Sequence, residues 1–450
     1  MKIYSWLMAG LLATAAQADV FEQTLPNGLK VIVKEDHRAP TVVQQVWYRA
    51  GSMDERPGVT GVAHVLEHMM FKGTKTVPAG EFSRRIAAAG GRENAFTSYD
   101  YTAYFQQLHK SKLSLAMQME ADRMRNLLLS PAEFGKEIKV VMEERRWRTD
   151  DEAHALMGER LMATAYQAHP YRNPVIGWME DLQKMDWHDA QQWYHAWYVP
   201  NNATLVVVGD VKAPEVFALA RRYYGAIPAG KLPQRKMLDE PAQLGIKRIV
   251  VKAPAELPHL MMAWHAPTLR DVERDWRPYA LAVLSGVLDG NDAARLNRSL
   301  VRGQQVALSV ETGYDYTSRG PALFTLEATP AAGRSVTELE AAIRRELQAV
   351  VDAGVTEEEL QRVRAQITAA EVYKLDSVFY QAMQIGQMES VGLSHRALPV
   401  MLKKLQAVTA EQVQEAAREL LRDDNLTIAV LDPQPVGDKP HHAGGMGHAH

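Results

Sequence analysis

The 450-residue sequence contains no cysteine. This absence excludes disulfides, cysteine-linked lipid anchors and thiolate metal ligands, so any metal site must be built from histidine and carboxylate side chains. Acidic and basic residues nearly balance, with a formal net charge of −3, and no basic surface for nucleic acid is therefore expected. No apolar run reaches the roughly 20 residues of a membrane-spanning helix, so no membrane span is predicted.

The first twenty residues have the pattern of a secretory signal peptide. Lys2 precedes an apolar stretch at residues 3–16, and Ala16-Gln17-Ala18 matches a small-residue cleavage site. We expect cleavage after Ala18 and a periplasmic or secreted protein, with an uncleaved N-terminal anchor as the alternative. Because an exported protein without cysteine has no disulfide framework, a bacterial periplasm is the simplest compartment.

The length and a weak internal repeat predict two related halves. A single hydrophobic core usually stops growing at roughly 250–300 residues, so two or more domains are expected. The segment NATLVV from Asn202 matches NLTIAV from Asn425, at an offset of 425 − 202 = 223 residues. At an offset of 222, residues 64–68 (HVLEH) fall on residues 286–290 (GVLDG), which keep the apolar frame and lose both histidines. A duplication with chemistry in the first half alone is therefore predicted.

Hydrophobic periodicity predicts both strands and helices in the first half. Strands are expected at residues 30–33, 42–50 and 205–208, and helices at 61–73, 79–89, 111–128 and 131–148. This mixture predicts the α+β class.

A metal-binding pattern lies within GVAHVLEHMMFKG. His64 and His68 are four residues apart, so on a helix both imidazoles project from one face. Glu67 lies three residues after His64 and reaches the same face. H-x-x-E-H is the inverse of the commoner H-E-x-x-H zinc motif. An exposed helix with scattered polar residues is the alternative interpretation of so short a pattern.

A second helical segment offers the third ligand that a zinc site needs. Zinc with three protein ligands and one open position is typical of catalytic sites. Glu137 and Glu144 are seven residues apart, two turns along one helix face. One of them can ligate the metal while the other accepts the N–H of a ligating histidine. Glu143 is expected to point elsewhere, as a solvated residue near Arg145 or Arg146.

These motifs together resemble the pitrilysin/insulysin family of inverted-motif zinc peptidases, which includes mitochondrial processing peptidase. That family has a glutamate downstream of H-x-x-E-H at the spacing found here, 144 − 68 = 76. The resemblance implies that His64, His68 and Glu144 hold one zinc ion per chain, that Glu137 supports them, and that Glu67 is the general base. Shared phrases include Tyr198-x-Pro200-x-Asn202, VVGD at residues 207–210, and NAFT at residues 94–97.

The resemblance also implies a fold and a substrate class. Each half would be an α+β unit in which an antiparallel sheet is packed with helices. A peptide or unfolded polypeptide would bind as an extended strand along the substrate-binding residues Asn94, Ala95, Phe96 and Thr97. The expected organisation is a signal peptide at 1–18, a catalytic zinc-binding half at 19–230, a linker at 231–246, a homologous non-catalytic half at 247–435, and a flexible His- and Gly-rich tail at 436–450.

One feature of active relatives is missing from the second half. Those relatives carry an arginine and a tyrosine, seven residues apart, that contact the substrate and the developing oxyanion. The aligned segment, residues 300–308, has Val301 and Leu308 at these positions, with Arg302 and Tyr314 or Tyr316 as fallback candidates. We therefore expect a zinc metalloendopeptidase whose paralogous partner subunit supplies the pair. The alternative is a non-catalytic scaffold or peptide-binding subunit of the same fold.

Overall fold

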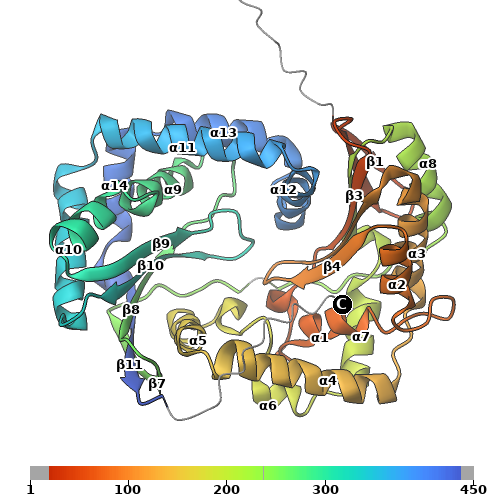
Figure 1. Ribbon diagram of the computed structural model, residues 1–450, viewed down its shortest axis with the longest axis horizontal. Helices are drawn as coiled ribbons and strands as arrows, with labels where there is room; N and C mark the ends of the chain where they lie inside the picture. The colour runs from red at the N-terminus through yellow and green to blue at the C-terminus, as the bar shows by residue number, and fades with distance from the viewer. Residues whose placement is uncertain (1–19, 237, 437–450) are drawn as a thin grey trace, which may run out of the picture.

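Two β-sheets, one in each half of the chain, organise the fold (Figure 1). The computed structural model describes residues 20–236 and 238–436. The predicted signal peptide and nearly all of the predicted His- and Gly-rich tail lie outside these residues. None of the helices in the described part of the chain combines the length and hydrophobicity needed to cross a bilayer.

The first sheet has six strands in the order β1-β2-β6-β3-β5-β4. All neighbouring strands are antiparallel except β2 and β6, which are parallel. In the described residues β4 pairs with β5 alone, so its other edge is free. The strands are β1 (Val20–Thr24), β2 (Lys30–Glu35), β3 (Thr41–Tyr48), β4 (Arg92–Thr97), β5 (Thr102–His109) and β6 (Ala203–Gly209).

The second sheet repeats this arrangement with five strands in the order β7-β11-β8-β10-β9. Its one parallel pair is β7 and β11, which occupy the places of β2 and β6. The predicted fold of two related α+β halves is confirmed. One parallel pair in each sheet departs from a purely antiparallel prediction, because β6 and β11 each return after long helical crossovers. The strands are β7 (Lys247–Pro254), β8 (His259–Ala266), β9 (Ala307–Tyr314), β10 (Ala322–Pro330) and β11 (Leu426–Gln434).

Helices cover both sheets. The first half contains α1 (Val62–Met69), α2 (Glu81–Ala88), α3 (Leu113–Asn126), α4 (Pro131–Arg145), α5 (Ala153–Ala165), α6 (Met179–Leu182), α7 (Trp187–Trp197) and α8 (Ala213–Tyr224). The second contains α9 (Trp276–Asp289), α10 (Val336–Ala353), α11 (Glu357–Leu375), α12 (Val378–Val391), α13 (Leu398–Ala407) and α14 (Ala410–Leu420). Where a helix was predicted at 131–148, the α-helix ends at Arg145 and continues as a π-helical turn, Arg146–Asp150.

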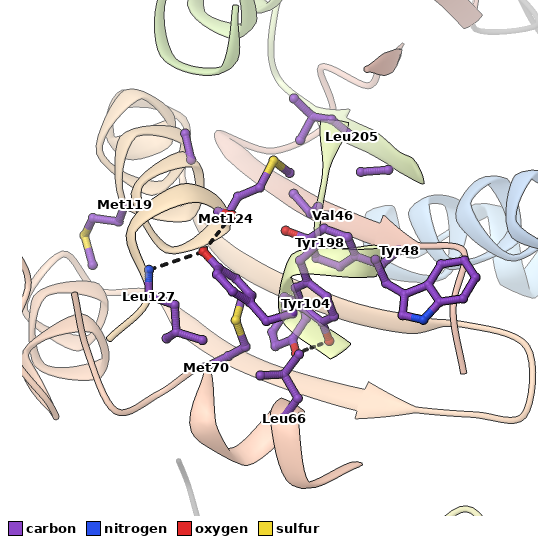
Figure 2. Close-up of a cluster of buried hydrophobic side chains, with 14 of the residues drawn as sticks. Val46, Tyr48, Leu66, Met70, Tyr104, Met119, Met124, Leu127, Tyr198 and Leu205 are labelled. Carbon is purple, nitrogen blue, oxygen red and sulfur yellow. Dashed lines mark hydrogen bonds between the residues drawn. The ribbon is translucent and has the colours of Figure 1, made fainter. Parts of the chain in front are cut away.

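The core of the first half lies between its sheet and α1, α3, α7 and α8. Figure 2 shows Leu66 of α1 beside Tyr104 and Tyr198, whose hydroxyl groups are 2.8 Å apart. Tyr48 stacks on Tyr198 with ring centroids 4.1 Å apart. The bond between Tyr104 and Tyr198 gives each of these buried hydroxyl groups a polar partner in the apolar interior. The inner face of α1 is thus fixed by packing.

Each half also contributes a helix to the other half's sheet. From the first half, α5 packs on β7, β8 and β11 through Met157 and Leu161. From the second half, α12 packs on β3 and β6, where Ala382 and Ile385 join a cluster with Val206 and other residues of the first sheet. Burial of apolar surface in both exchanged contacts therefore holds the halves together.

Gly386 lets α12 lie directly on the indole ring of Trp47. A Cβ atom at residue 386 would come within 2.0 Å of Trp47 Cε2.

We predict that Gly386→Ala lowers the free energy of unfolding by about 1–3 kcal/mol, because overpacking must displace the helix or the ring. Gly158→Ala in α5 is the matched control, since nothing lies within 4 Å of that Cβ, and it should be neutral or stabilising by up to about 1 kcal/mol. Denaturant unfolding of both variants tests this; equal stability of Gly386→Ala and wild type would contradict it.

An ion-pair cluster also links the halves. Lys30 Nζ of β2 lies 2.8 Å from Glu389 Oε2 of α12, and the Nδ1 atom of His395 lies 2.8 Å from Glu389 Oε1. Burial opposes ionisation of Glu389, but its bonds to His395 and Lys30 lower the pKa of its carboxyl group to about 2.

We predict that Glu389→Gln destabilises the protein by about 1–2 kcal/mol near neutral pH and loses this effect in acid. The pKa of about 2 in the folded protein lies below the ordinary value of 4.5, so between these values the folded state binds fewer protons than the unfolded state. The stabilisation is therefore complete above about pH 4.5 and is lost as the pH falls toward 2. Urea unfolding at pH 7 and pH 3 measures the difference between wild type and variant, and an equal difference at both values would disprove the assignment.

Candidate metal centre

Helix α1 presents a polar face opposite the face that packs in the core. Val65, Leu66 and Met69 are buried in the first core, while the 3.6-residue period places His64, Glu67 and His68 on the other side. The helix begins after Gly61, which has φ 88°. A Cβ atom at Gly61 would lie 2.5 Å from the Ile176 carbonyl oxygen, so this close approach requires glycine.

The N-terminus of α1 is held by a buried carboxylate, Glu55. Its two oxygens accept hydrogen bonds from the backbone N–H groups of Gly61 (2.8 Å) and Ala63 (2.9 Å). Burial raises the pKa of Glu55 to about 8, although both backbone donors favour the ionised form. A carboxylate at this end satisfies helix N–H groups that have no partner within the helix. The position of α1 is therefore fixed along its axis as well as by its apolar face.

Three candidate ligands converge where α1 crosses α4. His68 Nε2 lies 3.2 Å and His64 Nε2 3.8 Å from the same oxygen, Oε2 of Glu144, and the three ligand atoms all lie within 4.8 Å of one another. A tetrahedral ion with bonds of about 2.0–2.1 Å separates its ligands by roughly 3.3 Å. Two imidazole nitrogens and one carboxylate oxygen at these distances therefore fit a zinc ion.

Glu137, two turns before Glu144 on the same face of α4, fixes the ring of His68. Glu137 Oε1 lies 3.0 Å from His68 Nδ1, and its other oxygen lies 2.6 Å from Lys72 Nζ. Because an ionised carboxylate accepts but does not donate, Nδ1 carries a proton toward Glu137, which leaves Nε2, the atom that faces Glu144, as the nitrogen that could ligate a metal. Burial disfavours the ionised form of Glu137, but His68 and Lys72 lower its pKa.

The electrostatics of the cluster favour positive charge between the ligands. Burial disfavours protonation of His68, yet its bonds to Glu137 and Glu144 raise its pKa to about 9. Burial likewise opposes ionisation of Glu144, but His68 and His64 hold its pKa at about 2. A divalent cation would balance the negative charge of the same carboxylates while both imidazoles stay neutral, as metal ligation requires.

Glu67 lies on the same face of α1 and is held by a hydroxyl group. Thr97 Oγ1 donates a hydrogen bond of 2.5 Å to Glu67 Oε2. Burial raises the pKa of Glu67, and the Thr97 bond and the neighbouring His68 partly oppose this rise. A carboxyl group whose pKa is raised toward neutrality is suited to accept and then return a proton.

The four predicted substrate-binding residues all lie on β4, but their side chains differ in environment. Asn94 is exposed, and Ala95 packs against the first core. Phe96 points to the other face of the sheet, 5.4 Å from the ring of Trp47. Thr97 ends the strand and bonds to Glu67. Among the described strands none pairs with the outer edge of β4, and this edge lies beside the cluster.

Other candidates from the sequence lie elsewhere. Glu143 Oε2 pairs with Arg146 at 2.6 Å on the exposed side of α4. Val301 packs against the second core, and Leu308 on β9 is 59% exposed. Two of the fallback groups have other partners, since Arg302 bonds to the Asp292 carbonyl and the Tyr314 hydroxyl to the Pro267 carbonyl. The third, Tyr316, packs against the second core.

Three contributing residues were missed in the sequence. Lys72 lies four residues after His68, a spacing that could have identified it. Arg148 lies 2.7 Å from Glu144 Oε1 and four residues after it in the chain, so the same rule applies. Glu55 acts from the loop before α1, and no periodic signal indicates a loop contact of this kind.

Comparison with known proteins matches both halves to one family. The family described as Insulinase (Peptidase family M16) matches residues 30–178, and the one described as Peptidase M16 inactive domain matches residues 185–367. A Helicobacter pylori protein named zinc protease PqqE is 34% identical over 63% of this chain and 64% of its own length. A Mycobacterium leprae protein named uncharacterized zinc protease ML0855 is 31% identical over 93% of each chain.

Solved structures have the same fold. The crystal structure of a protease from Helicobacter pylori superposes with a TM-score of 0.87 at 28% identity, covering 92% of this chain and 100% of that one. The Escherichia coli periplasmic protease PqqL superposes with a TM-score of 0.80 at 20% identity, covering 93% of this chain and 48% of that one. The family resemblance inferred from the motifs is confirmed.

We predict that Glu137→Gln weakens zinc binding about 10–100-fold, because the ring of His68 loses its ionised acceptor. Glu133→Gln is the matched control on α4, since Glu133 pairs only with exposed Lys136 among the ion pairs of the described residues. Competition with a chromophoric chelator measures both affinities. Equal affinities for the two variants would show that Glu137 has no part in binding.

Proposed function

The chain belongs to the M16 (insulinase) peptidase family, and from this premise we propose that it is a zinc metalloendopeptidase. The observation that carries the proposal is the convergence of His64, His68 and Glu144 within 4.8 Å, with Glu67 beside them. One zinc ion per chain would be held there. Zinc with three protein ligands supplies Lewis-acid chemistry that polarises a carbonyl group and lowers the pKa of water.

Glu67 would carry the proton transfers of peptide hydrolysis. Its carboxylate accepts a proton from the attacking water as the oxygen adds to the scissile carbonyl carbon. When the C–N bond breaks, Glu67 returns that proton to the departing amine nitrogen. The raised pKa of its carboxyl group makes the carboxylate a stronger base for the first of these proton transfers. The other residues of the cluster hold and orient the ligands.

The substrate would be a peptide or an unfolded polypeptide bound as an extended strand. Along Asn94, Ala95, Phe96 and Thr97, alternate residues turn their backbone N–H and C=O groups toward the edge of β4 that no described strand pairs with. Strand addition at such an edge recognises extension more than sequence. Because Thr97 lies within hydrogen-bond distance of Glu67, a strand paired with β4 would pass beside the general base.

A paralogous partner subunit would supply the missing arginine and tyrosine. Val301 and Leu308 occupy the aligned positions, and neither side chain can donate a hydrogen bond to an oxyanion. Such donors are worth roughly 10²–10³ in rate. The Escherichia coli PqqL chain supports the idea of a paired unit. The protein described here covers 48% of the PqqL chain, and the first half of PqqL alone superposes on it with a TM-score of 0.75.

The compartment that we propose is the bacterial periplasm. Residues 1–18 have the signal-peptide pattern, and the structural neighbour PqqL is a periplasmic protease.

The missing Arg/Tyr pair favours a second candidate function, a peptide-binding or scaffold subunit without turnover. Chelator-sensitive cleavage of unstructured peptides, measured with and without the co-expressed paralogue, separates the two functions.

We predict that Glu67→Gln retains one zinc ion per chain and lowers kcat by about 10²–10⁴-fold, since the amide cannot accept the proton of the attacking water. His64→Ala and Glu144→Ala should instead lose the metal. Zinc content by mass spectrometry and peptide cleavage are measured on the same preparations. Turnover at the wild-type rate in zinc-replete Glu67→Gln would refute the role of Glu67.

A further inference from the structure

The turn between β9 and β10 carries a buried arginine from the second half into contact with the β4–β5 turn of the first half. Arg319 is 6% exposed. Its guanidinium group donates to both carboxylate oxygens of Asp54, at 2.9 and 3.2 Å, and to the backbone oxygen of Asp100 at 3.0 Å. Its backbone N–H donates to Asp100 Oδ2 at 2.9 Å. Arg319 therefore joins two segments of the first half that are far apart in sequence.

The first of these segments leads to Glu67 through β4. Asp100 lies in the tight turn between β4 and β5, where the Ser98 N–H donates to the Tyr101 carbonyl at 2.8 Å. The Tyr171 hydroxyl donates to Asp100 Oδ1 at 2.5 Å, so the carboxylate of Asp100 is bound on both sides. This turn follows directly after Thr97, whose hydroxyl holds Glu67. A shift of the turn would therefore move the donor that orients Glu67.

The second segment leads to Glu67 through α1. Asp54 precedes Glu55, whose carboxylate binds the first N–H groups of α1. The two residues before Asp54 bond to the same β4–β5 turn. The Ser52 N–H donates to the Ser98 carbonyl at 3.1 Å, and the Met53 N–H donates to the Tyr99 carbonyl at 2.9 Å. Both segments bound by Arg319 thus end at Glu67, one at its helix and one at its side chain.

We propose that Arg319 is a positioning residue that holds Glu67 in its reactive orientation through the β4–β5 turn and Thr97. The second half, which carries no zinc ligand, would in this way set the geometry of the general base in the first. The proposal rests on the proposed function. Its physical reason is that a displacement of about 1 Å in a reacting group can cost 10²-fold in rate, whereas a buried ion pair adds little net stability but fixes the groups that it joins.

Kinetics of four variants tests the proposal. Thr97→Val removes the hydroxyl and keeps the shape, and Thr97→Ser keeps the hydroxyl. Arg319→Lys keeps the charge but loses the two-pronged contact. We expect Thr97→Val and Arg319→Lys each to lower kcat about 10-fold with KM and zinc affinity within threefold of wild type, and Thr97→Ser to retain most activity. Glu389→Gln, which breaks a different ion pair between the halves, should leave kcat unchanged.

A double-mutant cycle shows whether Arg319 acts through Thr97. If it does, the Thr97→Val/Arg319→Lys double variant is no slower than the slower single variant. Multiplicative losses, or an unchanged kcat in folded Arg319→Lys, would overturn the proposal. Arg319→Ala is unsuitable as the sole variant, because it leaves buried Asp54 without this partner and threatens folding.

Crystal structures of wild type and Arg319→Lys give a readout that needs no turnover. The Glu67 carboxylate should move out of hydrogen-bond reach of Thr97 in the variant. If it stays in place, the positioning role is wrong. A wild type that stays inactive together with its co-expressed paralogue would, by contrast, refute the proposed peptidase function, so the two failures are distinguishable.

Discussion

The crossing of α1 over α4 is the contact on which the candidate metal centre depends. It brings together the imidazoles of His64 and His68 and the carboxylates of Glu137 and Glu144. The side chains of His68 and Glu137 are each only 6% exposed. Removing such groups from water is costly unless they are paired. Each carboxylate is accordingly balanced, Glu137 by His68 and Lys72, and Glu144 by Arg148 and the two histidines. The apolar face of α1 and the Glu55 anchor supply the packing that keeps these charges in place.

The exchange of α5 and α12 explains why the second half remains necessary although it lacks zinc ligands. Without α12, the face of the first sheet that contains Ile32, Val43 and Trp47 would be exposed to water. Without α5, the second sheet would lose the cover over Met261 and Leu431. Neither half buries its own sheet on both faces. Hydrophobic burial therefore makes the two halves one structural unit, and this unit positions the β9–β10 turn against the first half.

Local signals in the sequence predicted the helices and the ligand pair, whereas long-range contacts were beyond their reach. The i, i+4 spacing of His64 and His68 and the periodicity of residues 131–148 identified α1 and α4, because helix faces follow from spacing alone. Pairing these helices through Glu144 needed the family resemblance, since spacing within α4 left Glu137 and Glu144 equivalent. The contacts of Glu55 and Thr97 depend on how loops and strand ends meet in three dimensions. Amino-acid composition and hydrophobic periodicity carry no information about such long-range contacts. The parallel strand pairs were missed for the same reason.

The division of chemistry between the halves has an electrostatic consequence. Under the proposed function the first half would supply a cation site and a proton carrier, and so would activate water. Peptide hydrolysis also develops negative charge on the carbonyl oxygen, and preorganised donors lower its energy most where water is excluded. At the aligned positions the second half has Val301, which packs in its core, and Leu308, which is exposed on the edge strand β9. An apolar side chain on an open edge leaves room for a donor from another molecule, and under the proposed function stabilisation of the oxyanion would therefore be the part of the reaction that a partner supplies.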